Sequence, residues 1–148
     1  MSKILVIGNA IIDQVMQIAQ FPEQDQEMRA IGQTTSIGGN ACNTAQILTQ
    51  LGHQVQLVSS LGNDNEAHDL AAALAKKNVG TQHCVTIKDH KTPFSSIWLN
   101  QQNGSRTIIH YRHLPELKID DLLSIDLAGY DWIHLEGRNI DTLKSYLE

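Results

Sequence analysis

A diglycine followed by two asparagines is the part of this sequence with the clearest binding chemistry. Gly38 and Gly39 end an expected extended segment, and Asn40 and Asn43 then fall in the first turn of a helix. Residues three apart share a helix face, so both carboxamides can point the same way. The first turn also offers backbone N–H groups without partners, and glycine lets a ligand approach the backbone closely. Such groups suit a small, uncharged, hydroxyl-rich molecule such as a sugar, although capping of an ordinary strand–turn–helix junction explains the stretch equally well.

An acidic residue, Asp13, follows the first apolar run by a few positions. Residues 4–7 are apolar on both faces, which predicts a buried strand of a parallel sheet. In open α/β sheets, ligands bind beyond the carboxyl ends of the strands. A carboxylate there can accept hydrogen bonds from two neighbouring hydroxyls. A solvated loop aspartate is the alternative interpretation.

Two charged residues, Glu136 and Arg138, flank Gly137 just after another apolar run, residues 132–135. If that run is a buried strand, its carboxyl end is a second ligand-facing edge. A structural ion pair, or charges at the start of a helix, explains the two residues equally well.

No metal site is predicted. His110 and His113 have no third ligand at a zinc-like spacing, so a surface pair is expected. Cys42 and Cys84 lack the C-x-x-C spacing, which indicates neither a disulfide framework nor a zinc site. The phosphate-binding GxxxxGK[ST] loop, the dinucleotide-binding GxGxxG fingerprint and the GxSxG nucleophile motif are also missing from the sequence.

Composition indicates one ordinary globular domain. The chain has 148 residues, of which 41% are hydrophobic and 18% charged. The net charge is −5 and no run of adjacent cations is longer than Lys76-Lys77, which argues against a nucleic-acid partner. The N-terminus lacks the pattern of a signal peptide, and no apolar run approaches the length of a membrane span. We therefore expect a cytoplasmic chain without a membrane partner.

Strand and helix patterns alternate along the chain, which predicts an α/β fold with a parallel sheet. The apolar or β-branched runs at 4–7, 55–58, 85–87 and 132–135 predict strands, and the patterns over 41–51, 63–77 and after 139 predict helices. Asn103-Gly104 between two β-rich runs predicts a hairpin. This hairpin and the polar segment 13–36 are expected to form an antiparallel addition to the sheet.

The glycines and asparagines together resemble a known family signature. The ribokinase-type (PfkB) carbohydrate kinases carry a Gly-Gly turn, then an asparagine, then two spaced glycines. The matching positions here are Gly38, Gly39, Asn43, Ala45, Gly52 and Gly62. Within that family, segments 103–108 and 132–139 are most similar to the ketohexokinase (fructokinase) branch, and the resemblance covers nearly the whole chain. It implies a ribokinase-like α/β fold, with a mostly parallel sheet flanked by helices and a small antiparallel β-sheet lid formed by about residues 13–36 and 94–112.

The resemblance also implies roles for individual residues. The positions that would bind the sugar substrate are Asp13, Gly39, Asn40, Asn43, Glu136 and, reaching into the site of a partner subunit, Asp25. The positions that would face the nucleotide phosphates are Arg106 and Arg138. No catalytic residue and no metal ligand is implied within residues 1–148.

The implied activity is the ATP-dependent phosphorylation of a ketohexose such as D-fructose. Its implied cofactors are ATP and Mg²⁺, with a monovalent cation as a further candidate, and its implied assembly is a homodimer formed through the lid. Family members are considerably longer, and their Gly-Ala-Gly-Asp run with the catalytic base has no counterpart here. We therefore expect the N-terminal, sugar-binding half of a kinase, inactive alone, without the nucleotide-binding half.

Two alternatives stay open. One is a non-catalytic sugar-binding or dimerisation module, and the other is a family kinase for another sugar or a nucleoside. Acidic substrates are not favoured, because no cluster of cations is expected near the Gly-Gly turn.

Overall fold

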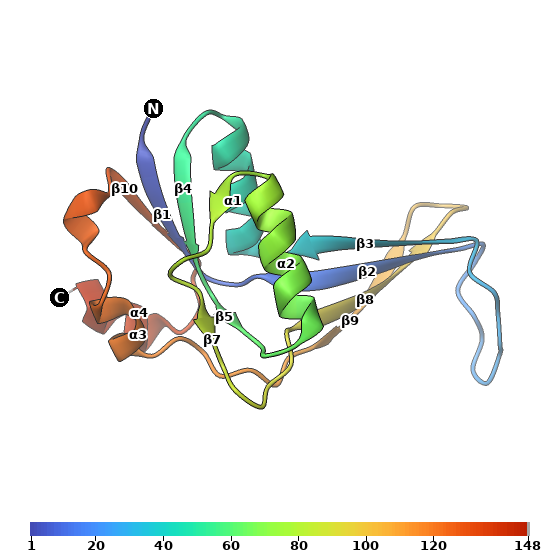
Figure 1. Ribbon diagram of the computed structural model, residues 1–148. Helices are drawn as coiled ribbons and strands as arrows, with labels where there is room; N and C mark the ends of the chain where they lie inside the picture. Colours follow the sequence, from blue (N-terminus) through green and yellow to red (C-terminus); the bar gives the residue numbers. More distant parts are fainter. Residues whose placement is uncertain (148) are drawn as a thin grey trace.

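The computed structural model describes residues 1–147, which form a central parallel sheet between helices and a second sheet that extends to one side (Figure 1). The strands of the central sheet are, in spatial order, β10 (Trp132–Leu135), β1 (Lys3–Ile7), β4 (Gln54–Val58) and β6 (Val79–Gly80). All three pairings are parallel. The predicted α/β class and parallel sheet are therefore confirmed.

Side chains of β1 alternate between two hydrophobic cores, as the period of a strand requires. Ile4 and Val6 pack in one core with α1 (Asn40–Gln50) and α2 (Asn65–Lys76), whereas Leu5 and Ile7 pack in the other. The second core includes α3 (Ile119–Leu123) and α4 (Ile140–Leu147), which cover the opposite face of the sheet (Figure 1). This burial on both faces explains why the strand reads as a continuous apolar run.

The second sheet, which we call the lid, extends away from the central sheet (Figure 1). Its strands are, in spatial order, β3 (Gly32–Gly38), β2 (Ile11–Ile18), β8 (Phe94–Asn100) and β9 (Arg106–Tyr111). The β2–β3 and β8–β9 pairs are antiparallel, but β2 and β8 run parallel. The lid is therefore mixed rather than wholly antiparallel, because both inner strands leave the central domain side by side and in the same direction.

A two-stranded parallel sheet, β5 (Ser60–Leu61) with β7 (Val85–Thr86), continues the path of β4. Asp64 follows it and caps α2, because its carboxylate accepts a hydrogen bond of 3.0 Å from the Ala67 N–H. The same carboxylate accepts from the Thr92 N–H at 2.8 Å and from the Thr92 hydroxyl at 2.6 Å, which ties α2 to the start of β8. Burial raises the pKa of Asp64, but these hydrogen bonds outweigh it and leave the pKa below its ordinary value.

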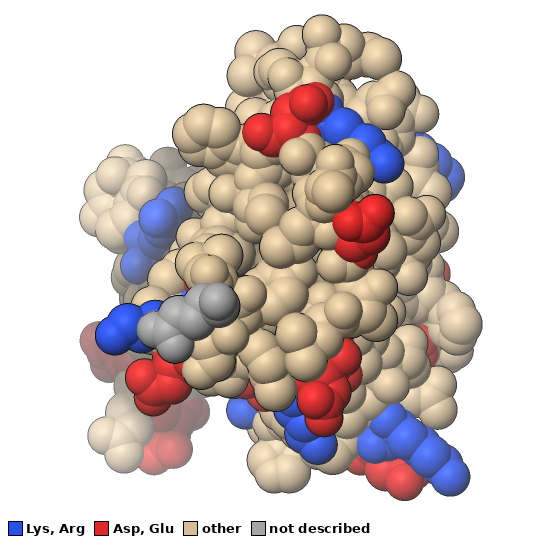
Figure 2. All heavy atoms as spheres, turned by 90° about the vertical axis from the view of Figure 1, so that its left-hand side faces the viewer, with Lys and Arg blue, Asp and Glu red and all other residues tan. Residues whose placement is uncertain are grey.

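The short 3₁₀ helix η1 (Leu127–Gly129) leads into β10, which is an edge strand of the central sheet and exposes Trp132. Figure 2 shows acidic and basic side chains interspersed over a largely uncharged surface on one face of the molecule. Within residues 1–147, every helix is too short or too polar to cross a lipid bilayer.

Candidate functional site

The diglycine turn brings α1 against the loop that follows β1. Gly39 has a φ of 96°, and a Cβ atom at that position would collide with the backbone oxygen of Asn9. That oxygen instead accepts a hydrogen bond of 3.1 Å from the Cys42 N–H in the first turn of α1. Glycine is required at position 39 both for the left-handed backbone and for this close approach.

The carboxylate of Asp13 lies beside the same turn. Asp13 belongs to β2 rather than to a loop, and it pairs with Ser36 of β3 and Ser95 of β8. A Cβ atom at Gly38 would overlap the Asp13 carboxylate. Burial raises the pKa of the Cys42 thiol to about 11, and the negative charge of Asp13 adds to the shift. Asp13 therefore lies near both the diglycine turn and the first turn of α1.

The side chains of Asn40 and Asn43 are exposed and do not cap α1. The N-cap residue is Gly39, and no side chain makes a capping hydrogen bond there. The Asn40 amide donates to Glu136 Oε1 at 3.2 Å, whereas the Asn43 amide oxygen lies 3.5 Å from the Gln46 amide nitrogen. The capping interpretation of the two asparagines is thus wrong, and both carboxamides are accessible.

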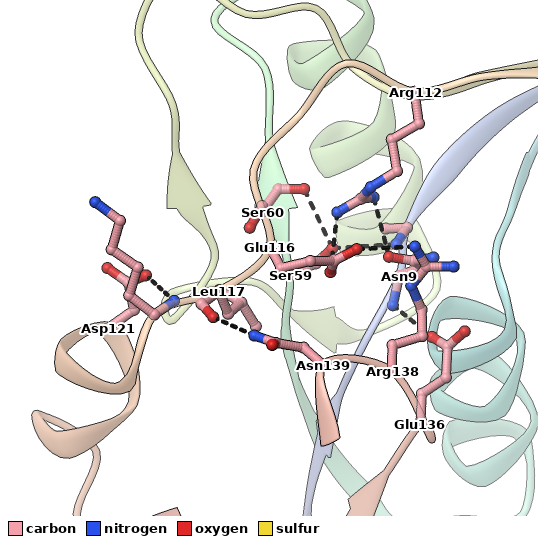
Figure 3. Close-up of polar contacts among 12 residues, drawn as sticks. Asn9, Ser59, Ser60, Arg112, Glu116, Leu117, Asp121, Glu136, Arg138 and Asn139 are labelled. Atoms are coloured by element: carbon pink, nitrogen blue, oxygen red, sulfur yellow. Dashed lines mark hydrogen bonds and ion pairs between the residues drawn. The ribbon is translucent and has the colours of Figure 1, made fainter. Parts of the chain in front are cut away.

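Glu136 joins the carboxyl ends of β1 and β10 to the start of α1. Its Oε2 accepts a short hydrogen bond of 2.6 Å from the Asn9 N–H (Figure 3). Its Oε1 accepts a hydrogen bond of 3.2 Å from the Asn40 amide. A side chain at Gly8 would collide with the Glu136 carboxylate and with Ala41. The three elements therefore converge on this carboxylate, at the edge of the sheet where the sequence predicts a ligand.

A cluster of two arginines around Glu116 lies next to Asn9 (Figure 3). Arg112 Nη1 donates to Asn9 Oδ1 at 3.0 Å and Arg112 Nη2 lies 3.2 Å from Glu116. Arg138 Nη2 lies 2.8 Å from the other oxygen of Glu116, so Arg138 is engaged in an ion pair. Burial lowers the pKa of the Arg112 guanidinium, and Glu116 opposes that shift.

This cluster corrects the expectation that no cations gather near the diglycine turn. Sequence reasoning did not single out Asn9, Arg112 or Glu116. Arg112 and Glu116 are four residues apart, but the segment that joins them is not helical, so their spacing did not predict the ion pair. The contact of Arg112 with Asn9 spans 103 positions. A contact of that range leaves no periodic pattern in the sequence.

A small cavity of about 20 Å³, partly open to solvent, lies between these groups. Its lining includes Asn9, Ser60, Arg112, Glu136 and Asn139. Ser60 Oγ and Arg112 Nε are buried there without a hydrogen-bond partner among the described residues.

Two expected site residues lie elsewhere. Asp25 is exposed in the loop between β2 and β3, at the outer end of the lid (Figure 1). Arg106 pairs with Leu99, which lies four residues along β8 from Ser95, the partner of Asp13. Arg106 therefore lies roughly 13 Å further from the central sheet than Asp13 does. Within the described chain, neither residue reaches the cluster around Glu136.

The histidine pair has ordinary partners. His110 Nδ1 lies 3.1 Å from the Ser95 hydroxyl, and the ring of His113 stacks on His90 at 5.7 Å between centroids. In residues 1–147, His, Cys, Asp and Glu side chains nowhere gather in a group of three or more that could hold a metal ion.

Comparison with known proteins matches residues 1–144 to the pfkB family of carbohydrate kinases. The chain belongs to this family. It is 34% identical over 138 residues to the ketohexokinase of Mus musculus, covering 93% of this chain and 46% of that protein. It is also 24% identical over 149 residues to the guanosine-inosine kinase of Exiguobacterium acetylicum, covering 100% of this chain and 48% of that protein.

Among solved structures, the ribokinase of Arabidopsis thaliana complexed with ribose and ATP has the same fold. The TM-score is 0.80 at 21% identity, and the match covers 99% of this chain and 48% of that chain. The ribokinase-like fold expected from the sequence is therefore confirmed. The chain spans about half the length of the relatives it matches.

Proposed function

We propose that the complete protein is a cytoplasmic, ATP-dependent kinase that phosphorylates a ketohexose such as D-fructose, and that this chain supplies its sugar-binding half. The observation that carries the proposal is the convergence of polar groups at the diglycine turn. Glu136 accepts hydrogen bonds from Asn9 and Asn40, and the carboxylate of Asp13 lies against Gly38. The 34% identity to a ketohexokinase supports the choice of sugar.

The proposed binding chemistry follows from the donors and acceptors present. Carboxylates accept hydrogen bonds from sugar hydroxyls, so Asp13 and Glu136 would each hold hydroxyls of the substrate. The amides of Asn40 and Asn43 both donate and accept hydrogen bonds, so they can pair with sugar hydroxyls that act as donors or as acceptors. The Cβ side of Gly39 is filled by Asn9, so the contribution of Gly39 would be the turn that places both asparagines.

Phosphoryl transfer additionally needs a phosphate donor, a base and groups that stabilise charge. ATP would supply the phosphoryl group, with Mg²⁺ and a monovalent cation as candidate ions. The described residues do not fit ATP or these ions. Arg138 is paired with Glu116, and Arg106 lies at the far end of the lid. Residues 1–147 contain no group of three or more His, Cys, Asp and Glu side chains that could hold a metal ion. We therefore assign the base and the nucleotide pocket to the remainder of the complete protein and expect the 148-residue chain alone to be inactive.

The proposed assembly is a homodimer formed through the lid. The strand register places Asp13, Val15, Ile97 and Ile108 on one face of the lid, and every residue of β9 is exposed. A second copy packed on that face would cover its apolar side chains. It would also carry its exposed Asp25 toward the site that contains Asp13.

A nucleoside kinase is the second candidate, because the guanosine-inosine kinase match extends over the whole chain. A coupled assay of ADP release by the complete protein, with D-fructose, D-ribose, guanosine and inosine, separates the two. We expect the highest kcat/KM with D-fructose. A higher kcat/KM with either nucleoside would overturn the ketohexose assignment, and binding of sugar without turnover would favour a non-catalytic module.

A further inference from the structure

Arg112 lies where the chain returns from the lid to the central domain. It directly follows the last lid strand, β9, and its side chain is only 12% exposed. Its guanidinium divides its donors between two acceptors, Asn9 Oδ1 at 3.0 Å and Glu116 at 3.2 Å (Figure 3). The lid is thereby attached to the loop that follows β1.

Asn9 connects Arg112 to the proposed sugar site. Its side chain is held by Arg112, its N–H donates to Glu136, and its backbone oxygen accepts from Cys42 in the first turn of α1. The same oxygen is the atom that a side chain at Gly39 would strike. A shift of the Asn9 backbone would therefore move the N–H donor that orients Glu136.

We propose that Arg112 is a positioning residue: through Asn9 it holds the Glu136 carboxylate in its sugar-binding orientation and makes sugar affinity depend on the placement of the lid. This inference rests on the proposed function. Arg112 itself touches no substrate in this role. The forked guanidinium suits the task, because it can bond Asn9 and Glu116 at once, whereas a lysine ammonium is a single point of charge.

The competing explanation is purely structural, with Arg112 acting only as one member of the ion cluster formed with Glu116 and Arg138. The variant Glu116→Gln distinguishes the positioning role from the structural role. Glu116→Gln breaks the ion pairs of both arginines but leaves the bond from Arg112 to Asn9 available. A structural role predicts similar effects for Glu116→Gln and Arg112→Ala, whereas the positioning role predicts a larger effect for Arg112→Ala.

The experiment compares Arg112→Ala, Arg112→Lys and Glu116→Gln in the complete protein, with Lys76→Ala as the control that removes an exposed cation from the last turn of α2. Sugar KM, ATP KM, kcat and melting temperature are measured for each. We expect Arg112→Ala to raise the sugar KM about tenfold, the effect of one charge-assisted hydrogen bond. ATP KM should stay unchanged, Arg112→Lys should recover part of the loss, and Glu116→Gln and Lys76→Ala should change the sugar KM by less than about twofold.

A second measurement places the same change in a Glu136→Gln background. If Arg112 acts through Glu136, the effect of Arg112→Ala on the sugar KM shrinks there, because interacting residues are not additive. An undiminished effect in that background, or an unchanged sugar KM for Arg112→Ala alone, overturns this inference but leaves the proposed function intact. A wild-type protein that neither binds nor phosphorylates any sugar overturns the proposed function first, and the inference with it.

Discussion

The Glu136 carboxylate accepts a 2.6 Å hydrogen bond from the backbone N–H of Asn9, although 127 positions separate the two residues. Asn9 follows β1, and Glu136 follows β10, the strand that pairs with β1 in the central sheet. Parallel pairing brings the carboxyl ends of these strands to one edge, where the first turn of α1 adds Asn40. The candidate site is thus a direct product of the sheet topology.

Removal of the Asp13 carboxylate should weaken sugar binding. We expect Asp13→Ala to reduce the affinity of the complete protein for D-fructose by about 1.5–3 kcal/mol, the contribution of a hydrogen bond to a charged group. Isothermal titration calorimetry measures this directly. Asp69→Ala, on the exposed surface of α2, is the control. An affinity equal to that of the wild type would exclude Asp13 from the sugar site.

A side chain at Gly39 should destabilise the fold more than one at Gly52. Both glycines have left-handed backbones, with φ of 96° and 89°, but a Cβ atom at Gly52 meets no other atom within 4 Å. Gly52→Ala should cost about 1–2 kcal/mol from the backbone conformation alone. Gly39→Ala should cost a further 1–3 kcal/mol or so, because the added atom strikes Asn9. Urea unfolding of both variants tests the difference, and equal losses would contradict the close approach.

The cap of α2 should lose its contribution to stability in acid. The pKa of Asp64 lies below its ordinary value of 3.8, so its ionised form stabilises the folded state above that pH. This contribution disappears as the pH falls through the lowered pKa. Asp64→Ala should cost about 1 kcal/mol at pH 7 and progressively less below pH 4. Urea unfolding at several pH values checks this, and a cost that persists at low pH would argue against the ionised cap.

Both cysteines should resist alkylation in the folded protein. Burial raises the pKa of Cys42 to about 11 and that of Cys84 to about 12, and the reactive species is the thiolate. At pH 8 we expect iodoacetamide to modify neither thiol until urea unfolds the chain. Mass spectrometry of samples with and without urea provides the readout. Rapid modification of Cys42 without urea would show that the start of α1 opens readily.

The lid offers a matched pair of residues for testing the homodimer. Ile108 and Ile109 are adjacent and exposed, at 49% and 57%, and they lie on opposite faces of β9. Ile108 shares its face with Asp13. We expect Ile108→Lys to dissociate the complete protein into monomers in light scattering, whereas Ile109→Lys leaves the dimer intact. The reverse result would place the partner on the other face of the lid.

The central sheet and the residues of the diglycine turn could be predicted from the sequence, because both leave local patterns. Buried strands such as β1 give continuous apolar runs, and the start of α1 follows directly from the two glycines. The parallel pairing of β2 with β8 could not be predicted, because turn signals report only on strands that are adjacent in sequence. The contact of Arg112 with Asn9 was missed for the same reason, since it depends on where the lid returns to the sheet.

The structure of the complete protein bound to D-fructose tests the central claim most directly. We predict sugar hydroxyls about 2.6–3.2 Å from the Asp13 carboxylate and from the amide of Asn43, with Glu136 still bonded to Asn9. A sugar bound elsewhere, or a bound sugar with Asp13 turned away from it, would contradict the assignment of the diglycine turn as the substrate site.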